Sequence, residues 1–366
     1  MNINVNRVAR LQEKMRNESF DYLLLGPFSN MYYFSGFRAS PDERLQLLVI
    51  PSEGKPAAVL PEMYLHAAKE IIGIDYDLTA WSDQSDPFQM VHERMAGGNN
   101  LHIAVDDLLR ADHLLGLIRV MPDAVFEPAG LLTDALRTCK DDHEIKLMQE
   151  ACKIADRVMA AVQKEIRPGL REKDLALFIE TEYKKLSDDV SFKPIVASGP
   201  NAALPHHSPG DRILQKGDFI VVDCGAVYNG YCSDITRTFC LGKATAEMKK
   251  VYQVVQDANA KAFEALEKNS QLSGEEVDGA ARAVITAAGY GHLFTHRTGH
   301  GIGMEVHEAP YLVEGNSEPL KQGMTFTIEP GIYLPEKFGV RIEDVVVITG
   351  QGVRRLTSFN RDLIEL

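Results

Sequence analysis

With 366 residues, the chain is too long for one ordinary compact core, so we expect two domains. Hydrophobic residues make up 45% of the sequence and charged residues 25%, which is typical of folded globular proteins and excludes a disordered chain. The formal net charge of −13 argues against nucleic acid or an anionic membrane as the main partner, because both bind a basic protein face.

The N-terminal segment MNINVNRVARLQEKM lacks the apolar core of a signal peptide, and no run approaches the roughly 18 apolar residues of a membrane span. The five cysteines include no Cys-x-x-Cys pair, which is typical of reduced, structural thiols. We therefore expect a cytoplasmic protein that does not bind membranes. The cysteines are Cys139, Cys152, Cys224, Cys232 and Cys240.

The first part of the chain alternates helical and strand signals. Val5, Val8, Leu11 and Met15 recur at helical spacing. The segments DYLLLG, LQLLVIP and AAVLP follow and have the composition of short buried strands. This alternation predicts an α/β domain.

The α/β pattern ends near residues 125–130, where the turn sequence FEPAG precedes a long charged helix from about Lys140 to Glu165. We place the domain boundary in this neighbourhood. The expected domains are residues 1–130 and 131–366.

The second part contains strand-like runs, among them FIVVDCG, YCSDITRTF, TFTIEPG and VRIEDVVVIT. Short turns at residues 228–230 and 337–339 could close hairpins, which favours an α+β arrangement over a doubly wound parallel sheet. The predicted helices span residues 140–165, 171–187, 245–268 and 273–288.

Two segments of the second part share one pattern. Residues 214–223 and 320–329 each contain a leucine, two polar residues, a glycine, an extended run and a final carboxylate, with a glycine two residues further on. The pattern suggests two related halves, which deliver Asp223 and Glu329 to a shared place. Chance similarity between short segments is the alternative.

Four carboxylates lie in strand-like, mostly apolar runs, and burying such a group unpaired costs several kcal/mol. Each therefore needs a cation, hydrogen-bond donors or solvent, although strand-end acids can also simply cap turns. Arg341 precedes Glu343 by two residues, so on a strand the two side chains would project from the same face. Arg341 could orient one of the acids, or it could simply form a salt bridge with Glu343. The four acids are Asp223, Asp234, Glu329 and Glu343.

The segment from His296 to Glu308 adds three histidines and closely spaced glycines, which allow the backbone to approach a ligand. A phosphate-binding loop is the competing interpretation, but the strand–helix unit of a dinucleotide fingerprint does not surround this segment. A further pair, His206 and His207, precedes the first acidic strand, and a lone histidine in such a place is often structural. Four carboxylates and one histidine suit two divalent ions, such as manganese, cobalt or iron, better than a single tetrahedral zinc.

At these residues the sequence resembles the M24-type metallopeptidases, the family of methionine aminopeptidase, aminopeptidase P and proline dipeptidase, whose catalytic domain has the pseudo-symmetric pita-bread fold. The likeness is strong over the C-terminal two thirds. The segments that carry it are Asp223-x-Gly225, Ser233-Asp234-Ile-Thr-Arg-Thr, His296-x-Thr-Gly-His300-Gly-Ile-Gly, Thr327-Ile-Glu329-Pro-Gly and Arg341-Ile-Glu343-Asp344.

The resemblance implies five metal ligands, of which Asp234 and Glu343 are the bridging pair. Creatinase shares the fold without these ligands, so the filled positions disfavour a metal-free, creatinase-like activity. The implied ligands are Asp223, Asp234, His300, Glu329 and Glu343.

The N-terminal third separates the members of this family. Residues 26–37, GPFSNMYYFSGF, resemble the start of the creatinase-type N-terminal α/β domain, which methionine aminopeptidases lack. Together with Pro205-His206 before the first acidic strand, this implies the proline-specific branch, and the short chain favours proline dipeptidase over aminopeptidase P. The resemblance also implies a homodimer that acts on Xaa-Pro dipeptides.

The implied chemistry is hydrolysis of the peptide bond before proline by two divalent ions, with manganese expected first and cobalt, iron or zinc as alternatives. We expect Glu329 to act as the general base as well as a ligand. His206 and His307 would stabilise the oxyanion or orient the substrate, His296 would contact the substrate, and Arg341 would orient an acid. The alternatives are an aminopeptidase P acting on longer peptides and a catalytically inactive binding scaffold.

Overall fold

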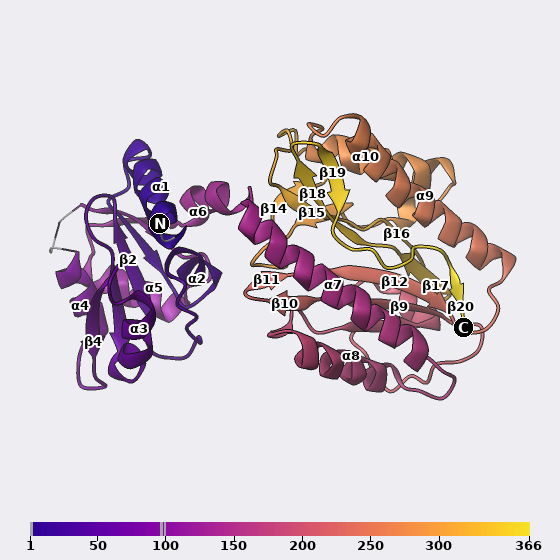
Figure 1. Cartoon of the computed structure of the whole chain (residues 1–366), viewed down its shortest axis with the longest axis horizontal. Helices are drawn as coiled ribbons and strands as arrows, with labels where there is room; N and C mark the ends of the chain where they lie inside the picture. Colours follow the sequence, from indigo (N-terminus) through magenta and orange to yellow (C-terminus); the bar gives the residue numbers. More distant parts are fainter. Residues whose placement is uncertain (1–2, 96–97, 99) are drawn as a thin grey trace. The chain divides into compact units, whose positions relative to one another are not determined.

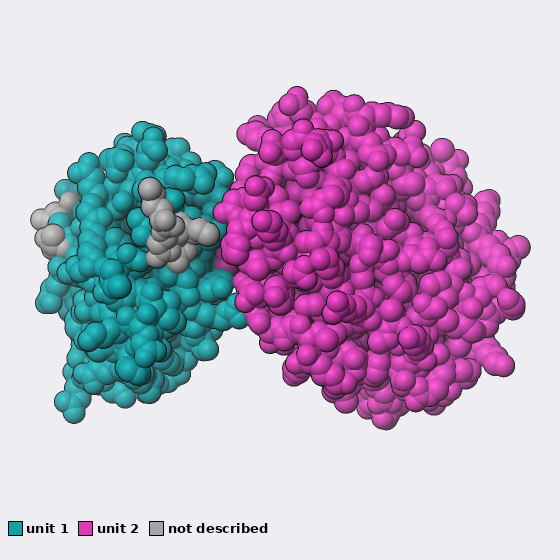
Figure 2. All heavy atoms as spheres, viewed as in Figure 1, with its two compact units in different colours: residues 1–137 teal, residues 138–366 magenta. Residues whose placement is uncertain are grey.

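The computed structural model describes residues 3–95, 98 and 100–366. The chain forms two compact units, Met1–Arg137 and Thr138–Leu366, which are coloured separately in Figure 2. Each unit has its own sheets and its own apolar core.

The division between the units falls a few residues beyond the position that we expected from the sequence. Helix α6 (Gly130–Arg137) lies between the two positions and is bonded to the first unit. Tyr33 donates a hydrogen bond of 2.9 Å to the carbonyl oxygen of Leu136 at the end of this helix. This contact explains why α6 belongs to the first unit and not to the second.

The first unit is built on one mixed sheet with strand order β4-β3-β2-β1-β5-β6. Strand β1 pairs antiparallel with β2 and parallel with β5. The three apolar runs that we predicted as strands form β1, β2 and β3. The strands are β1 (Tyr22–Leu25), β2 (Leu47–Pro51), β3 (Ala57–Pro61), β4 (Asp77–Trp81), β5 (His102–Val105) and β6 (Val125–Pro128).

The N-terminal helix α1 (Ile3–Asn17) forms as predicted and buries Val8, Leu11 and Met15, but Val5, the first residue of the predicted apolar series, is exposed. No helix in the described part of the chain combines the length and the apolar character needed to cross a membrane. The remaining helical elements of this unit are α2 (Ser29–Ser35), η1 (Glu62–Tyr64), α3 (Leu65–Ile72), α4 (Pro87–Arg94), α5 (Ala111–Val120) and α6.

The long helices of the second unit lie where the sequence predicted them. The helix α7 begins at a capping box between Asp141 and Glu144, and α10 begins at another between Ser273 and Glu276. The helical elements are α7 (Asp142–Glu165), α8 (Glu172–Leu186), η2 (Gly199–Ala203), α9 (Ala246–Lys268), α10 (Gly274–Ala287) and η3 (Gly291–Leu293).

The strands of the second unit pair antiparallel except for β12 with β20, which confirms the α+β arrangement. They form the sheets β11-β10-β7, β20-β12-β9-β8, β14-β13-β15-β18-β19 and β16-β17. Their bounds are β7 (Asp189–Val190), β8 (Ile195–Ser198), β9 (Phe219–Cys224), β10 (Ala226–Tyr228), β11 (Tyr231–Cys232), β12 (Ile235–Cys240), β13 (Gly299–Gly301), β14 (Glu308–Leu312), β15 (Thr325–Ile328), β16 (Gly331–Leu334), β17 (Phe338–Arg341), β18 (Asp344–Thr349), β19 (Gly352–Arg355) and β20 (Ile364–Glu365).

Both predicted hairpins form. Asn229 and Gly230 make the two-residue turn between β10 and β11, and both have positive φ, 49° and 83°, as a tight hairpin turn requires. The turn of the second hairpin lies earlier than we expected, because Phe338 and Gly339 already belong to β17 and pair with β16. The turn is therefore residues 335–337.

The second unit has two halves, each with its own sheet and helix pair (Figure 1). Helices α7 and α8 share a core with β9 and β12, whereas α9 and α10 share a core with β15 and β18. The two repeated segments of the sequence lead into β9 and β15, so each half supplies one of the acids expected from the repeat.

Candidate metal centre

Three buried side chains from separate segments of the chain converge in the second unit. Asp234 lies between β11 and β12, His300 lies in β13, and Glu343 lies between β17 and β18. Each offers one ligand atom, and these atoms all lie within 4.8 Å of one another. Such a group could hold a metal ion.

His300 presents an unprotonated nitrogen to this group. Its Nδ1 lies 3.1 Å from the carbonyl oxygen of Gly301, and because a carbonyl only accepts, Nδ1 carries the proton. Its Nε2 lies 3.8 Å from Asp234 Oδ2 and 3.4 Å from Glu329 Oε1. Burial lowers the pKa of His300 to about 3, so the ring is neutral, as a metal ligand must be.

Asp223, in β9, is paired with Arg341 at the end of β17. Arg341 Nη2 donates to Asp223 Oδ2 at 2.7 Å, and Nη1 donates to Tyr333 Oη at 2.9 Å. The structure does not bear out the alternative in which Arg341 neutralises Glu343. Strand β17 ends at Arg341, and Glu343 Oε2 accepts a hydrogen bond of 2.7 Å from Thr236 Oγ1.

The clustered acids leave buried oxygen atoms unsatisfied. Asp223 Oδ1, Asp234 Oδ1 and Glu343 Oε1 have no hydrogen-bond partner within the described residues. Burial and then the neighbouring carboxylates raise the pKa of Asp234 and of Glu343 well above the ordinary range, and burial raises the pKa of Glu329 to about 8. Because a cation would satisfy these oxygens and offset the repulsion, the residues present fit an oxygen-rich divalent metal centre.

A cavity of about 500 Å³ opens beside the acids. It brings together every site residue that we predicted from the sequence, although these residues come from both halves of the unit. They are His206, Asp223, Asp234, His296, His300, His307, Glu329, Arg341 and Glu343.

The histidines of the cavity differ in their surroundings. His296 Nε2 lies 2.8 Å from Tyr333 Oη, and its Nδ1 lies 2.7 Å from the carbonyl oxygen of Arg297. Burial lowers the pKa of His296 to about 4 and also lowers the pKa of His307, whose ring centre lies 4.3 Å from that of His300. Both rings are therefore neutral near pH 7.

The sequence reasoning did not assign several residues that line the same cavity. Phe192, Ile195 and Val306 give it apolar walls, and Arg297 adds a cation. The Arg297 guanidinium also lies 4.4 Å from the ring centre of Tyr311. Their position inside the histidine-rich segment was the available signal for Arg297 and Val306, whereas Phe192 and Ile195 lie outside every motif that we singled out.

Comparison with known families agrees with this geometry. The model of metallopeptidase family M24 matches residues 146–350, and the model of the Creatinase/Prolidase N-terminal domain matches residues 7–139. The chain belongs to metallopeptidase family M24. The creatinase-like N-terminal domain and the pita-bread catalytic domain expected from the sequence are thereby confirmed, and membership implies a divalent metal cofactor.

Relatives of this M24 metallopeptidase match over nearly the whole chain. A probable dipeptidase PepE of Mycobacterium bovis is 41% identical, covering 93% of this chain and 91% of that protein. A recombinant prolidase from Thermococcus sibiricus has a TM-score of 0.95 and 39% identity, with 100% of both chains covered. An X-Pro aminopeptidase from Thermotoga maritima has a TM-score of 0.86 and 32% identity, covering 98% of this chain and 99% of that one.

Proposed function

We propose that the protein is a proline dipeptidase, which hydrolyses the peptide bond before proline in Xaa-Pro dipeptides. The observation that carries this proposal is the convergence of four acids and one histidine, with unsatisfied oxygens, beside a cavity of about 500 Å³. The similarity to a prolidase and to a probable dipeptidase supports the choice of substrate.

In this proposal acids from both halves, together with His300 Nε2, would hold two divalent ions, and the family resemblance implies that Asp234 and Glu343 would serve both. We propose manganese first, with cobalt, iron or zinc as alternatives, because the ligand set is rich in oxygen. The proposed ligands are Asp223, Asp234, His300, Glu329 and Glu343.

When bound, the two ions would polarise the scissile carbonyl and lower the pKa of a water molecule. Glu329 is the proposed general base, which takes a proton from the attacking water and passes it to the leaving proline nitrogen. His206 and His307 would donate to the developing oxyanion, and His296, fixed by Tyr333, would contact the substrate.

The bond before proline is a tertiary amide without an N–H group, so a site cannot recognise it through a strand-like hydrogen bond. Phe192, Ile195 and Val306 offer an apolar surface against which the pyrrolidine ring could pack. Arg297 offers a positive charge on the same cavity, which suits the free carboxylate of a dipeptide. This charge supports a dipeptidase over an aminopeptidase that acts on longer chains.

Metal removal tests the proposal directly. Chelation should abolish hydrolysis of Xaa-Pro dipeptides, and added Mn²⁺ or Co²⁺ should restore it, while folded Asp234→Ala and Glu329→Ala variants should stay inactive. Full activity of the metal-free protein would reject the mechanism. Failure to bind any divalent ion at saturating Mn²⁺ would favour the inactive scaffold instead.

The substrate class needs a separate comparison of Xaa-Pro with Xaa-Pro-Yaa peptides. The wild type should cleave the dipeptide with a higher kcat/KM than the tripeptide. Arg297→Met should lose this preference, mainly because its KM for the dipeptide rises. Equal or better cleavage of the tripeptide by the wild type would favour the X-Pro aminopeptidase alternative. The structural similarity of this chain to the Thermotoga maritima X-Pro aminopeptidase supports the same alternative.

We also propose that the protein works as a homodimer in the cytoplasm. The family resemblance supports the dimer. The five cysteines, none of which forms a disulfide in the described part of the chain, support a reducing compartment such as the cytoplasm. Light scattering at micromolar concentration would test the dimer, and a monomer there would contradict it.

A further inference from the structure

The two acids of the second half, Glu329 and Glu343, lie where a pair of strands separates. Ile328 and Asp344 form the last register pair of β15 and β18, so both acids lie just outside this ladder. The amide of Glu329 donates to the carbonyl oxygen of Thr298 at 2.7 Å, and the amide of Glu343 donates to that of Thr236 at 3.1 Å. The two segments thus diverge toward different neighbours at the point where they carry the acids.

Asn259, on helix α9, donates hydrogen bonds to both of these diverging segments. Its Nδ2 donates to the carbonyl oxygen of Ile328 at 2.9 Å and to that of Ile342 at 3.3 Å. These are the residues directly before Glu329 and Glu343. Asn259 is only 1% exposed, and carbonyl oxygens only accept, so both of its amide hydrogens must point at the two segments.

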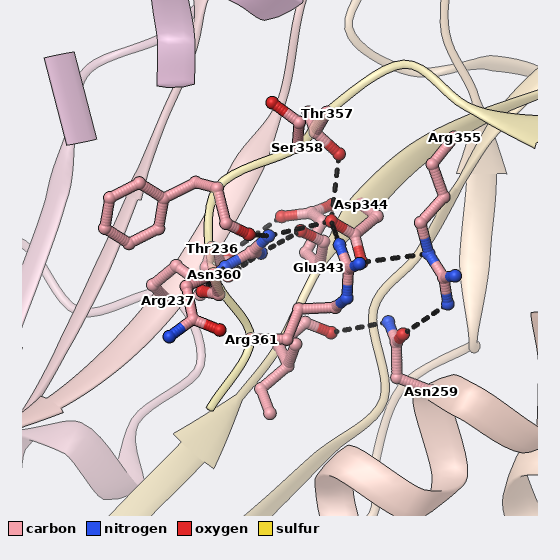
Figure 3. A network of polar contacts seen from close by, with 12 residues as sticks. Thr236, Arg237, Asn259, Glu343, Asp344, Arg355, Thr357, Ser358, Asn360 and Arg361 are labelled. Carbon is pink, nitrogen blue, oxygen red and sulfur yellow. Dashed lines mark hydrogen bonds and ion pairs between the residues drawn. The ribbon is translucent and has the colours of Figure 1, made fainter. Parts of the chain in front are cut away.

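The orientation of the Asn259 amide is fixed from its other side. Asn259 Oδ1 accepts a hydrogen bond of 3.2 Å from Arg355 Nη2, and Arg355 Nε lies 3.5 Å from Asp344 Oδ2. Arg237 pairs with the same carboxylate at 2.8 Å and donates to the carbonyl oxygen of Glu343 at 2.6 Å (Figure 3). The backbone on both sides of Glu343 is therefore bonded to one connected network.

We propose that Asn259 is a positioning residue that sets the separation of Glu329 and Glu343 and thereby the affinity of the metal centre. This inference rests on the proposed function, because it assumes that both acids bind the ions. Without the Asn259 amide, the carbonyl oxygens of Ile328 and Ile342 lose this shared donor, and the direct link between the two segments is lost. Residues that orient metal ligands in this way are typically worth about 10- to 100-fold in metal affinity.

The test compares Asn259→Leu, which keeps a similar volume without the donors, with Gln256→Leu on the same helix. Gln256 donates to Arg361 O and Asp362 Oδ1 and not to the carbonyl groups that precede the two acids. Metal-stripped proteins are titrated with Mn²⁺ by calorimetry, and the absorption spectrum of each Co²⁺-loaded protein is recorded. Asn259→Leu should bind Mn²⁺ about 10- to 100-fold more weakly and show an altered Co²⁺ spectrum, whereas Gln256→Leu should match the wild type.

Wild-type Mn²⁺ affinity and an unchanged Co²⁺ spectrum in folded Asn259→Leu would overturn the inference. If Asn259→Leu does not fold, Arg355→Met decides, since Arg355 is more exposed and its loss removes the hydrogen bond that holds Asn259 Oδ1 in place. An affinity equal to that of the wild type in Arg355→Met would then overturn it, and a weaker one would support it. Absence of Mn²⁺ binding by the wild type would instead refute the proposed function.

Discussion

Arg341 and Asp223 form a buried ion pair, with 2.7 Å between Nη2 and Oδ2, although the two residues lie in different halves of the catalytic unit. Arg341 also donates to Thr236 and Tyr333 through its other nitrogens. Arg341→Lys keeps the charge but cannot reproduce this planar set of donors. We expect kcat/KM for Xaa-Pro to fall by about 10- to 100-fold.

The matched control is Arg171→Lys, because Arg171 forms an exposed pair with Asp174. Its kinetics should equal those of the wild type. Unchanged kinetics of Arg341→Lys, measured on protein with a native circular dichroism spectrum, would show that charge alone suffices at this position.

The same ion pair should make the two metal positions unequal. One oxygen of Asp223 is already held by a guanidinium, whereas Asp234, His300 and Glu343, whose ligand atoms lie together, form no ion pair with an arginine or lysine among the described residues. Asp223→Asn should therefore lose one ion per chain and Asp234→Asn should lose both, as measured by metal analysis after dialysis against low Mn²⁺. Equal losses in the two variants would contradict this order of affinities.

Glu172 is fully buried at the start of α8, and its carboxylate anchors the segment that leads to His206. It accepts hydrogen bonds from Ser198 Oγ at 2.7 Å and from His207 Nε2 at 2.8 Å. Burial alone would raise the pKa of Glu172, but these bonds lower it, so the group is ionised. In Glu172→Gln, an amide NH2 group would face hydrogen-bond donors. The substitution should therefore lower the free energy of unfolding by about 1–3 kcal/mol.

The catalytic consequence should be separate from metal binding. Displacement of His206 should lower kcat for Xaa-Pro while the metal content stays at the wild-type level. The surface variant Glu247→Gln, whose partner Lys337 is exposed, serves as the control. Loss of metal in Glu172→Gln would mean that the segment also supports the acids.

Asp106 makes the stability of the first unit depend on pH. Burial raises the pKa of its carboxyl from 3.8 to about 6, so between these values the folded chain holds a proton that the unfolded chain has released. The free energy of unfolding should therefore fall as pH rises from about 4 to about 6, by on the order of 2–3 kcal/mol. In Asp106→Asn this decrease should be absent.

Urea titrations followed by tryptophan fluorescence can measure this effect. The chain has a single tryptophan, Trp81, which lies in β4 of the first unit and is buried. Its signal therefore reports on the unit that contains Asp106. Parallel pH profiles for the wild type and Asp106→Asn would contradict the raised pKa.

Much of the fold could be predicted because local sequence determines it. The helices α7 and α10 begin at capping boxes and show the expected periodicity, and the Asn229-Gly230 turn has few conformations other than a tight hairpin. The acids could be proposed as ligands because an apolar strand that ends in a carboxylate calls for a compensating charge.

The partners of these acids could not be predicted in the same way. Spacing along a strand suggested that Arg341 and Glu343 share a face, but β17 ends at Arg341, and this side chain meets Asp223 from the other half of the unit. Asn259 likewise lies on a helix without any motif, and its importance comes from two distant carbonyl groups. Contacts of this kind depend on tertiary packing and leave no local pattern.

The wide dispersal of the acids along the chain has a consequence for the lifetime of the protein. An unfolded chain does not hold Asp223, Asp234 and Glu343 together, because 120 residues separate the first from the last, so cations bind the native state more tightly and shift the folding equilibrium toward it. Starvation for the metal would then do more than stop catalysis. It would increase the fraction of molecules that open and become substrates for proteolytic degradation.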